Sequence, residues 1–244
     1  MAFTGVHSAA ALLPRTGKLS QVQGFPFGLG TSGVHELAEA QFGDTAAMTG
    51  FALAATKALP VGPILWISQW GLSQEHGALQ QRKIETFHGR MRPCLFVRPR
   101  KLFDTLWTIE EAIRSSAVAC VIADIAEADF TATRRLALAS SRHGVPVILL
   151  MPHTREGATA ATARWRVSSM PSAINRLDPR APGQTRWRAV LERSRNVPEL
   201  AGHTFDLDYN HETLSLNLAT RLAPRPAAPR KITGSQAEPW RRTG

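Results

Sequence analysis

Short strand-forming runs alternate with longer helical segments along most of this chain, and this alternation restricts the fold more than any other feature. The candidate strands are residues 34 to 37, 64 to 68, 94 to 97, 118 to 124 and 145 to 151. Brief apolar runs bounded by Gly or Pro are typical of strands that are buried on both faces. Strands separated by helices in this way predict an α/β fold, with a mostly parallel sheet covered by helices on both faces.

The segments between these runs carry helix signals. Residues 46 to 58 are rich in Ala, Leu, Met and Phe, which favour helices, and residues 78 to 88 predict a second helix. Apolar residues recur at helical spacing between residues 102 and 113, which indicates an amphipathic helix. Residues 131 to 143 predict a further helix, because Gly144 follows in the usual position past a helix end.

After residue 160 the pattern changes to alternation of apolar and polar side chains. The alternating stretches contain Trp165, Trp187, Leu207 and Leu216, each with apolar residues two positions away. A period of two predicts half-exposed strands. We expect these strands to be antiparallel and to extend one edge of the parallel sheet.

Opposite charges lie on two of these alternating stretches. Arg186 and Arg188 point outward from one stretch, and Asp206 and Asp208 point outward from another. If the two strands are neighbours, their charged side chains pair across the strands. We therefore expect cross-strand ion pairs on the exposed face of the antiparallel part.

The length of 244 residues suits one sizeable α/β domain with tails. We predict a flexible arm over residues 1 to 25, one domain over residues 26 to 222, and a disordered, basic, Pro-rich tail over residues 223 to 244. The formal net charge is +10, and the basic residues fall mostly after residue 164. This imbalance points to nucleic acid or an acidic protein as a partner.

The sequence carries no sign of export, membrane insertion or disulfide bonding. Cys94 and Cys120 both lie inside apolar runs, which favours buried, reduced thiols. No apolar run approaches the roughly 18 residues of a membrane helix, and the first residues lack the basic start of a signal peptide. We expect a cytoplasmic protein that does not contact the membrane.

Residues 28 to 33, G-L-G-T-S-G, match the spacing of a dinucleotide-binding loop. Such a loop binds pyrophosphate only when a strand precedes it and a helix follows it. Here a strand follows the glycines and none precedes them. We therefore interpret the segment as a flexible loop that leads into the first strand.

The segment from Glu36 to Phe51 has the strand, loop and helix order of a phosphate-binding loop. That loop needs glycines for its turn, a lysine for the β and γ phosphates, and Ser or Thr for magnesium. Gly43 and Thr45 are present, but Asp44 stands where the lysine is expected. Asp44 is a good N-cap for the helix that follows, and its carboxylate would repel a phosphate.

Other positions of a nucleotide site support the same interpretation. Asp124 ends a buried strand, where a magnesium-orienting acid would lie, although an acid at a strand end is also a common loop cap. Gln69 and Trp70 occupy the place of a water-activating carboxylate. The positioned positive charge that phosphoryl transfer requires is missing. Because zinc motifs and a nucleophile elbow are also absent from the sequence, we predict no catalytic residue, metal site or cofactor.

Arginines and tryptophans are interleaved in the second half of the chain. This mixture suits contact with phosphates and bases, and it equally suits a protein interface or a solvated sheet face. The choice between nucleic acid and protein therefore stays open. The candidate partner surface comprises Arg164, Trp165, Arg166, Arg186, Arg188, Arg193 and Arg195, with Arg176, Arg180 and Trp187 nearby in the sequence.

Several stretches of the sequence resemble the ImuA family of bacterial RecA-like proteins. They are G-V-H-E-L-A-E, P-I-L-W-I-S, L-W-T-I-E-E-A-I-R-S with the strand V-A-C-V-I-A-D after it, A-R-W-R-V-S-S and W-R-A-V-L-E-R-S-R-N. The resemblance covers about residues 28 to 222. Members of this family are encoded with ImuB and an error-prone polymerase in a damage-induced mutagenesis cassette.

The resemblance implies a RecA-like scaffold whose phosphate loop keeps its place and lacks its lysine. Asp124 falls at the second nucleotide-binding acid of RecA, and residues 152 to 162 are the counterpart of its second DNA-binding loop. The implied function is that of a non-catalytic accessory protein of translesion DNA synthesis in the SOS response, associated with the nucleoid. The implied partners are an ImuB-type polymerase-like protein, RecA and single-stranded DNA. Two alternatives stay open, a SulA-like cell-division inhibitor and an atypical RecA-like ATPase.

Overall fold

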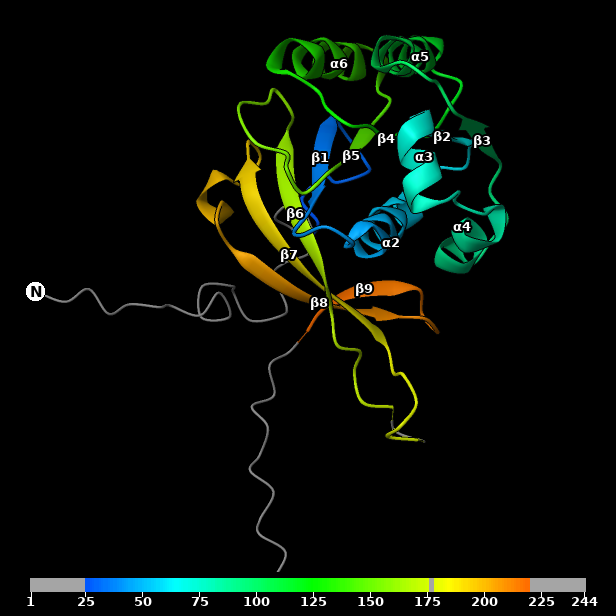
Figure 1. Cartoon of the computed structure of the whole chain (residues 1–244), viewed down its shortest axis with the longest axis vertical. Helices are drawn as coiled ribbons and strands as arrows, with labels where there is room; N and C mark the ends of the chain where they lie inside the picture. The colour runs from blue at the N-terminus through cyan, green and yellow to red at the C-terminus, as the bar shows by residue number, and fades with distance from the viewer. Residues whose placement is uncertain (1–24, 176–177, 220–244) are drawn as a thin grey trace, which may run out of the picture.

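The computed structural model describes residues 25–175 and 178–219, which form a nine-stranded sheet with helices on both faces (Figure 1). The strands lie in the order β3-β2-β4-β5-β1-β6-β7-β8-β9. Neighbours from β3 to β6 in this order pair in parallel, and β6, β7, β8 and β9 pair antiparallel. The bounds are β1 Val34–Glu39, β2 Ile64–Ser68, β3 Cys94–Val97, β4 Cys120–Asp124, β5 Val147–Met151, β6 Ala163–Met170, β7 Thr185–Ser194, β8 Thr204–Asn210 and β9 Ser215–Leu218.

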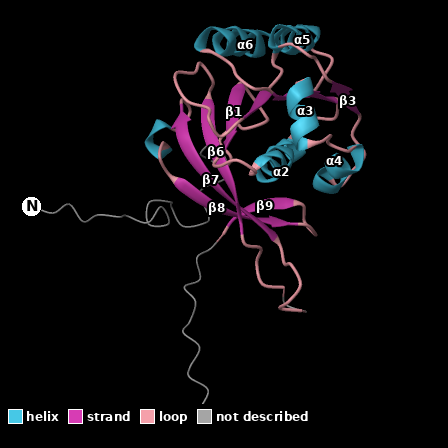
Figure 2. Ribbon diagram, in the orientation of Figure 1, coloured by secondary structure: helices cyan, strands magenta, loops and turns pink. Residues whose placement is uncertain are grey.

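The helices cover the parallel part of the sheet from two sides (Figure 2). Their bounds are α2 Thr45–Ala55, α3 Trp70–His76, α4 Gln81–His88, α5 Leu102–Ser115 and α6 Phe130–His143. Phe51 of α2 and Ile84 of α4 belong to one buried cluster, and Ile109 of α5 and Leu136 of α6 belong to the other. The predicted α/β fold, with helices on both faces and antiparallel strands at one edge, is confirmed.

Two details of the fold differ from the prediction. Strand β6 pairs in parallel with β1, so the antiparallel part begins only at β7. The alternation in β6 reflects one buried and one open face, which a parallel strand at this place has as well. Helix α3 is not predicted from the sequence, because residues 70 to 76 are mostly polar and lack a continuous apolar stripe.

The loop over residues 25 to 33 turns tightly before β1. Gly28, Gly30 and Gly33 have φ angles of 88°, 76° and 73°, a backbone region that favours glycine. Within the described residues no strand precedes this loop, and β1 follows it directly. The interpretation as an approach loop is therefore confirmed, and Phe27 from this loop stacks on Trp165 at a ring distance of 6.1 Å.

The core under the antiparallel strands is aromatic. Trp165 of β6 and Trp187 of β7 are 0% and 3% exposed and lie in the same buried cluster as helix α2. Gly50 of α2 permits this approach, because a Cβ atom there would lie 2.6 Å from Cζ2 of Trp187. The contact explains why a glycine occupies the middle of a helix, where it otherwise lowers stability.

Strand β1 buries an uncharged histidine, and this makes stability depend on pH. Burial lowers the pKa of His35 from 6.5 to about 4, and its Nε2 atom donates to the carbonyl oxygen of Ser32 at 2.8 Å. The unfolded chain takes up a proton near pH 6.5, whereas folded His35 stays neutral until about pH 4. Folding is therefore favoured above pH 6.5, and His35 alone should cost about 2 kcal/mol of stability between pH 7 and pH 5.

Urea unfolding at pH 7 and pH 5 measures this effect. His88 contributes in the same direction, because burial lowers its pKa to about 4 as well. The share of His35 is therefore the difference between the wild-type protein and His35→Gln, which keeps a side-chain donor. An equal pH dependence in both proteins would contradict the assignment.

Some sequence predictions concern regions or properties outside this sheet. The predicted arm over residues 1 to 25 and the predicted tail over residues 223 to 244 lie outside the described residues, except for Phe25. Cys94 and Cys120 are free, and burial raises the pKa of each thiol to about 12, so both are protonated at neutral pH. Among residues 25–175 and 178–219, no helix is long and apolar enough to cross a membrane.

Candidate functional site

The loop of residues 40 to 44 joins β1 to α2 and holds the candidate phosphate position. Gly43 has a φ of 97°, and a Cβ atom there would meet no atom within 4 Å. Backbone conformation, and not space, therefore favours glycine at this turn. Phe42 is 70% exposed and meets the ring of His153 edge to face. The loop itself contains no lysine or arginine.

Asp44 places a buried carboxylate at the start of α2. Its Oδ1 atom accepts hydrogen bonds from the backbone N and the Oγ of Ser169 on β6, at 2.9 and 2.8 Å. Asp44 is the N-cap residue of α2, as predicted, but its side chain makes no capping hydrogen bond to the helix. Asp44 is 2% exposed, and its Oδ2 atom has no partner among the described residues. Its negative charge occupies the helix end that would otherwise attract a phosphate.

Glu39 adds a second buried acid beside this loop. It ends β1, is 2% exposed and accepts a hydrogen bond from Oγ1 of Thr45. The Nδ1 atom of His153 lies 3.9 Å from its other carboxylate oxygen. Thr45, the expected magnesium-binding hydroxyl of a phosphate loop, is therefore bonded to a carboxylate of its own chain.

Asp124 ends β4 at the same end of the parallel sheet. Its Oδ2 atom accepts a hydrogen bond from Oγ of Ser68 at 3.1 Å and lies 3.7 Å from Nδ1 of His76. Burial raises the pKa of Asp124; the charge of His76 and the bond from Ser68 oppose this increase, and the charge of Glu39 adds to it. Gln69 is also engaged, because its Oε1 accepts from the backbone N of Ala126 at 3.1 Å.

The predicted remnant of a nucleotide site, residues Gly43, Asp44, Thr45 and Asp124, thus gathers at the carboxyl ends of parallel strands. The charges near it are mainly negative, and within the described part of the chain no three His, Cys, Asp or Glu residues are placed to hold a metal ion. Arg166 is a cation beside this loop, since its Nη1 donates to the backbone carbonyls of Glu39 and His153 at 3.0 and 2.8 Å. Its charge is neutralised by an ion pair with Glu192.

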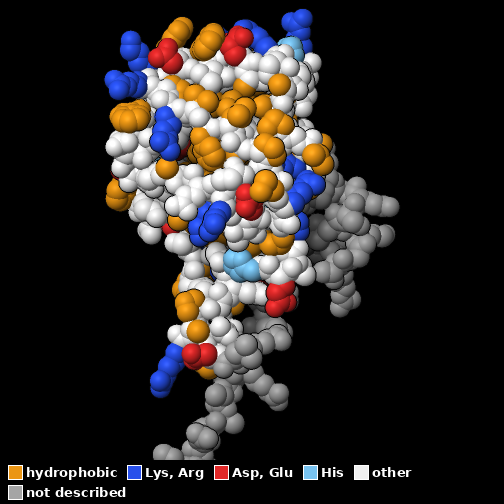
Figure 3. Space-filling view, turned by 90° about the vertical axis from the view of Figure 1, so that its right-hand side faces the viewer, with side chains coloured by type: hydrophobic (Ala, Val, Ile, Leu, Met, Phe, Trp, Pro, Cys, Tyr) orange, Lys and Arg blue, Asp and Glu red, His pale blue; other side chains and the backbone are white. Residues whose placement is uncertain are grey.

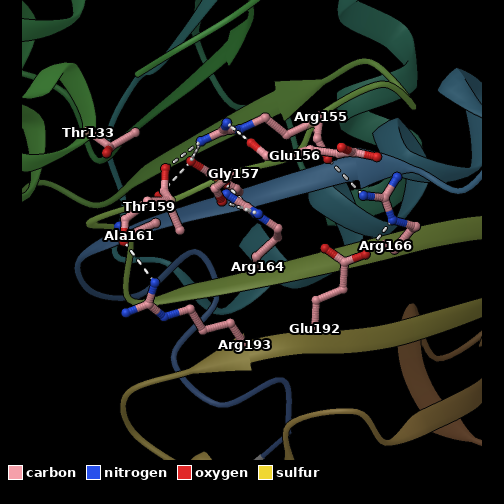
Figure 4. A network of polar contacts seen from close by, with 12 residues as sticks. Thr133, Arg155, Glu156, Gly157, Thr159, Ala161, Arg164, Arg166, Glu192 and Arg193 are labelled. Atoms are coloured by element: carbon pink, nitrogen blue, oxygen red, sulfur yellow. Dashed lines mark hydrogen bonds and ion pairs between the residues drawn. The ribbon is translucent and has the colours of Figure 1, made fainter. Parts of the chain in front are cut away.

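A buried ionic network fixes the long loop of residues 152 to 162 to the sheet (Figure 4). Glu36 of β1 is 0% exposed, and its Oε1 accepts from Nη2 of Arg155 at 2.9 Å and from Oγ1 of Thr159 at 2.6 Å. Its Oε2 accepts from Nε of Arg164 at 2.7 Å, and Nη1 of Arg164 reaches the carbonyl of Gly157 at 2.9 Å. The loop of residues 152 to 162 is therefore held in place by side chains of β1 and β6.

Glu36 and Arg155 were not among the predicted site residues. The available signal was a glutamate inside a strand that is otherwise buried, because such a carboxylate needs a cationic partner. The partner could not be identified from the sequence, since Arg155 lies 119 residues away.

The predicted arginine and tryptophan surface separates into two faces of the sheet. Trp165 and Trp187 point into the core, and Arg164 is 8% exposed and bonded to Glu36. The prediction of a partner surface is wrong for Trp165, because alternation in the strand turns its side chain to the core face. It is also wrong for Arg164, because its guanidinium is buried in an ion pair with Glu36. The more accessible members are Arg166, Arg186, Arg188, Arg193 and Arg195.

Most of these accessible arginines are paired with carboxylates. Nε of Arg186 lies 2.7 Å from Oδ1 of Asp208, and Nε of Arg188 lies 2.7 Å from Oδ1 of Asp206. The predicted cross-strand ion pairs between β7 and β8 are confirmed. Within the described residues, Arg193 and Arg195 take part in no ion pair, although Nη1 of Arg193 donates to the carbonyl of Thr159 at 3.1 Å.

The order of the sheet, its two helical layers and the loop between β1 and α2 define a RecA-like α/β protein. The fold is similar to the crystal structure of the RadB recombinase, with a TM-score of 0.51, 14% sequence identity, and coverage of 78% of this chain and 92% of that chain. No protein-family model matches the sequence.

The sequence is similar to Protein ImuA from two strains of Caulobacter vibrioides. The identity is 33% over 109 residues, which are 41% of this chain and 44% of each relative. The chain thus matches less than half of the length of these curated relatives. This similarity confirms the resemblance to the ImuA family.

Proposed function

We propose that this chain is an accessory protein of damage-induced translesion DNA synthesis, which acts by binding and does not hydrolyse ATP. The similarity to Protein ImuA supports the proposed role in damage-induced DNA synthesis. The main support for a non-catalytic role is the buried carboxylate of Asp44 at the start of α2, because it occupies the position where a phosphate would bind. Thr45, bonded to Glu39, supports the same conclusion.

The proposed partners are an ImuB-type polymerase-like protein, RecA and single-stranded DNA. The proposed contact surface is the open face of β6 and β7 with the residue after β7, and it comprises Arg166, Arg186, Arg188, Arg193 and Arg195. Ion pairs neutralise the first three of these arginines. This balance favours a protein partner over direct DNA binding, which depends on uncompensated positive charge.

Calorimetric titration with ATP and magnesium, together with a phosphate-release assay, tests the non-catalytic mode. We expect no saturable heat and no hydrolysis above background, with RecA as the positive control. Hydrolysis that disappears in Asp124→Ala would instead identify an atypical ATPase. Cell filamentation on expression, with capture of the tubulin-like division protein, would identify the SulA-like alternative.

Charge reversal at the two arginines without ion pairs tests the surface. Arg193→Glu with Arg195→Glu should weaken binding of the ImuB-type protein about tenfold or more and should reduce its dependence on salt. Arg134→Glu with Arg142→Glu on α6 changes the net charge equally at exposed positions elsewhere, so it is the matched control. Equal binding by both double variants, measured by surface plasmon resonance over a salt series, would contradict this placement.

The same titration with single-stranded DNA separates the two kinds of partner. Direct DNA binding predicts a linear fall of log affinity with log salt, with a slope of about 0.7 for each phosphate contact. We expect weak DNA binding by the chain alone and partner binding that does not require ATP.

A further inference from the structure

A cavity lies between the start of β1, the carboxyl end of α6, the loop before β6 and the residue after β7. Its volume is about 590 Å³, which is within the usual range for sites that bind small molecules. Three of its lining residues are nearly fully buried, since Val34, Ser140 and Ala160 are 0%, 2% and 4% exposed. The cavity meets the amino end of β1, so it is separate from the nucleotide-site remnant at the carboxyl ends of the parallel strands.

The cavity presents polar side chains that have no partner in the protein. The hydroxyl groups of Ser32, Ser141 and Thr162 form no hydrogen bond with another described residue. The guanidinium of Arg195 likewise forms no hydrogen bond or ion pair within the described part of the chain. These four side chains come from four separate segments, and together they offer both donors and acceptors to a ligand.

The charge around the cavity is positive. Among the described residues that line it, Arg195 is the only charged one. Arg142 and Arg193 follow and precede lining residues closely in the chain, are exposed, and take part in no ion pair with a described residue. An anionic group in the cavity would therefore meet a guanidinium without a competing carboxylate, the pairing that gives the strongest hydrogen bonds.

The carboxyl end of α6 adds a second requirement for the ligand. Ser141 and Gly144 bring this end of the helix to the cavity. The last carbonyl groups of a helix carry a partial negative charge, which opposes an anion and favours hydrogen-bond donors. A ligand that suits both sides therefore carries an anionic group toward Arg195 and hydroxyl groups toward α6.

The lining of the cavity disfavours nucleobases and apolar partners. None of the described lining residues is aromatic, so a base would find no ring on which to stack. By comparison, the side of the molecule in Figure 3 shows hydrophobic side chains gathered across its upper part, with Lys and Arg side chains around them. Such an apolar surface suits a protein partner, whereas a hydroxyl-lined cavity suits a small polar molecule.

We propose that this cavity binds a small sugar phosphate, with the phosphate on Arg195 and the sugar hydroxyl groups against Ser32, Ser141 and the end of α6. A sugar phosphate combines the anion and the hydroxyl donors that the two sides of the cavity require. The inference rests on the cavity and does not depend on the proposed function. Because Arg195 also belongs to the proposed partner surface, the tests include a change inside the cavity itself.

Calorimetric titration of the full chain with glucose 6-phosphate and with ribose 5-phosphate tests the proposal, since these probes cover a pyranose and a furanose. We expect saturable heat with at least one of them. The free sugar and inorganic phosphate, titrated separately, should each bind about tenfold more weakly or less, because each makes only part of the contacts. MgATP should not compete, because magnesium neutralises its phosphates and its adenine has no ring on which to stack.

Two variants assign the binding to the cavity. Arg195→Ala removes the cation, and Ser141→Leu removes a hydroxyl group and fills space in the cavity. Each should weaken binding at least tenfold, which corresponds to about 1.4 kcal/mol. Arg98→Ala and Thr131→Leu make similar changes at exposed positions outside the cavity, so they are the matched controls and should bind normally. All four side chains are exposed, so circular dichroism should show unchanged folding.

Three outcomes would overturn the proposal. The first is the absence of saturable heat with both sugar phosphates. The second is binding by Arg195→Ala and Ser141→Leu that equals that of the wild-type protein, which would place the ligand elsewhere. The third is equal or tighter binding in the cavity by MgATP or by an oligonucleotide with a 5′-phosphate, which would assign the cavity to nucleotides instead.

Discussion

Glu36→Ala should lower the free energy of unfolding by about 3–5 kcal/mol, because it leaves two buried guanidinium groups without their carboxylate. Glu36 is fully buried and bonds to Arg155, Arg164 and Thr159. Breaking a buried ion pair by removal of one partner is far more costly than losing an exposed pair. Urea unfolding followed by circular dichroism at pH 7 measures the change.

A double-mutant cycle with Arg164 shows whether the loss comes from the pair itself. Glu36→Leu with Arg164→Leu should cost less than the sum of the two single changes, since neither charge is then left alone. Arg188→Ala is the matched control, because the side chain of Arg188 is 44% exposed and its pair with Asp206 should contribute less than about 1 kcal/mol. Additive losses in the cycle would show that Glu36 and Arg164 act independently.

The same variant bears on the loop of residues 152 to 162. Arg155 and Thr159 belong to this loop and bond to Glu36, and the backbone N of Ala160 donates a hydrogen bond to Oγ1 of Thr133 at 3.0 Å. If the network orders the loop, Glu36→Ala should speed its cleavage by trypsin after Arg155 at urea concentrations that leave the protein folded. An unchanged cleavage rate would mean that other contacts hold the loop.

The parallel strands could be predicted from the sequence because buried strands are made of short runs of apolar residues. A strand covered on both faces is mostly apolar, as in β2, β4 and β5, whose residues are all buried. Helix α3 lacked this signal, because only Ser73 among its seven residues is buried. The parallel pairing of β6 with β1 could not be predicted either, since alternation indicates which face of a strand is buried and not the direction of the neighbouring strand.

The candidate nucleotide site could be located but its contacts could not. The lack of a lysine and the position of Asp44 follow from the sequence, whereas the partner of Asp44 is Ser169, 125 residues further along the chain. The capping preference of Asp is a local rule, and a tertiary hydrogen bond overrode it here. The ion pairs of Arg186 and Arg188 were predictable because both strands show clear alternation, which places their charges on one face.

Trp165→Ala should lower the free energy of unfolding by about 3–5 kcal/mol, the usual range for removal of a large buried aromatic side chain. Trp165 is 0% exposed and lies among Phe27, Phe51 and Phe205, with ring distances of 6.1, 5.7 and 5.8 Å. Its loss opens a cavity where the approach loop, helix α2 and strands β6 and β8 meet. Urea unfolding measures the change.

Two further variants show that burial, and not a surface role, explains this loss. Trp165→Phe keeps most of the ring volume and removes an indole N–H that has no hydrogen-bond partner among the described residues, so it should be much milder than Trp165→Ala. Trp107→Ala on α5 removes a side chain that is 57% exposed and should change stability by less than about 0.5 kcal/mol. If Trp165→Ala instead folded with wild-type stability and lost binding to single-stranded DNA or to the ImuB-type protein, Trp165 would have to lie on the partner surface. A stability loss of several kcal/mol leaves the arginines on the opposite face of β6 and β7 as the side chains that a partner can reach.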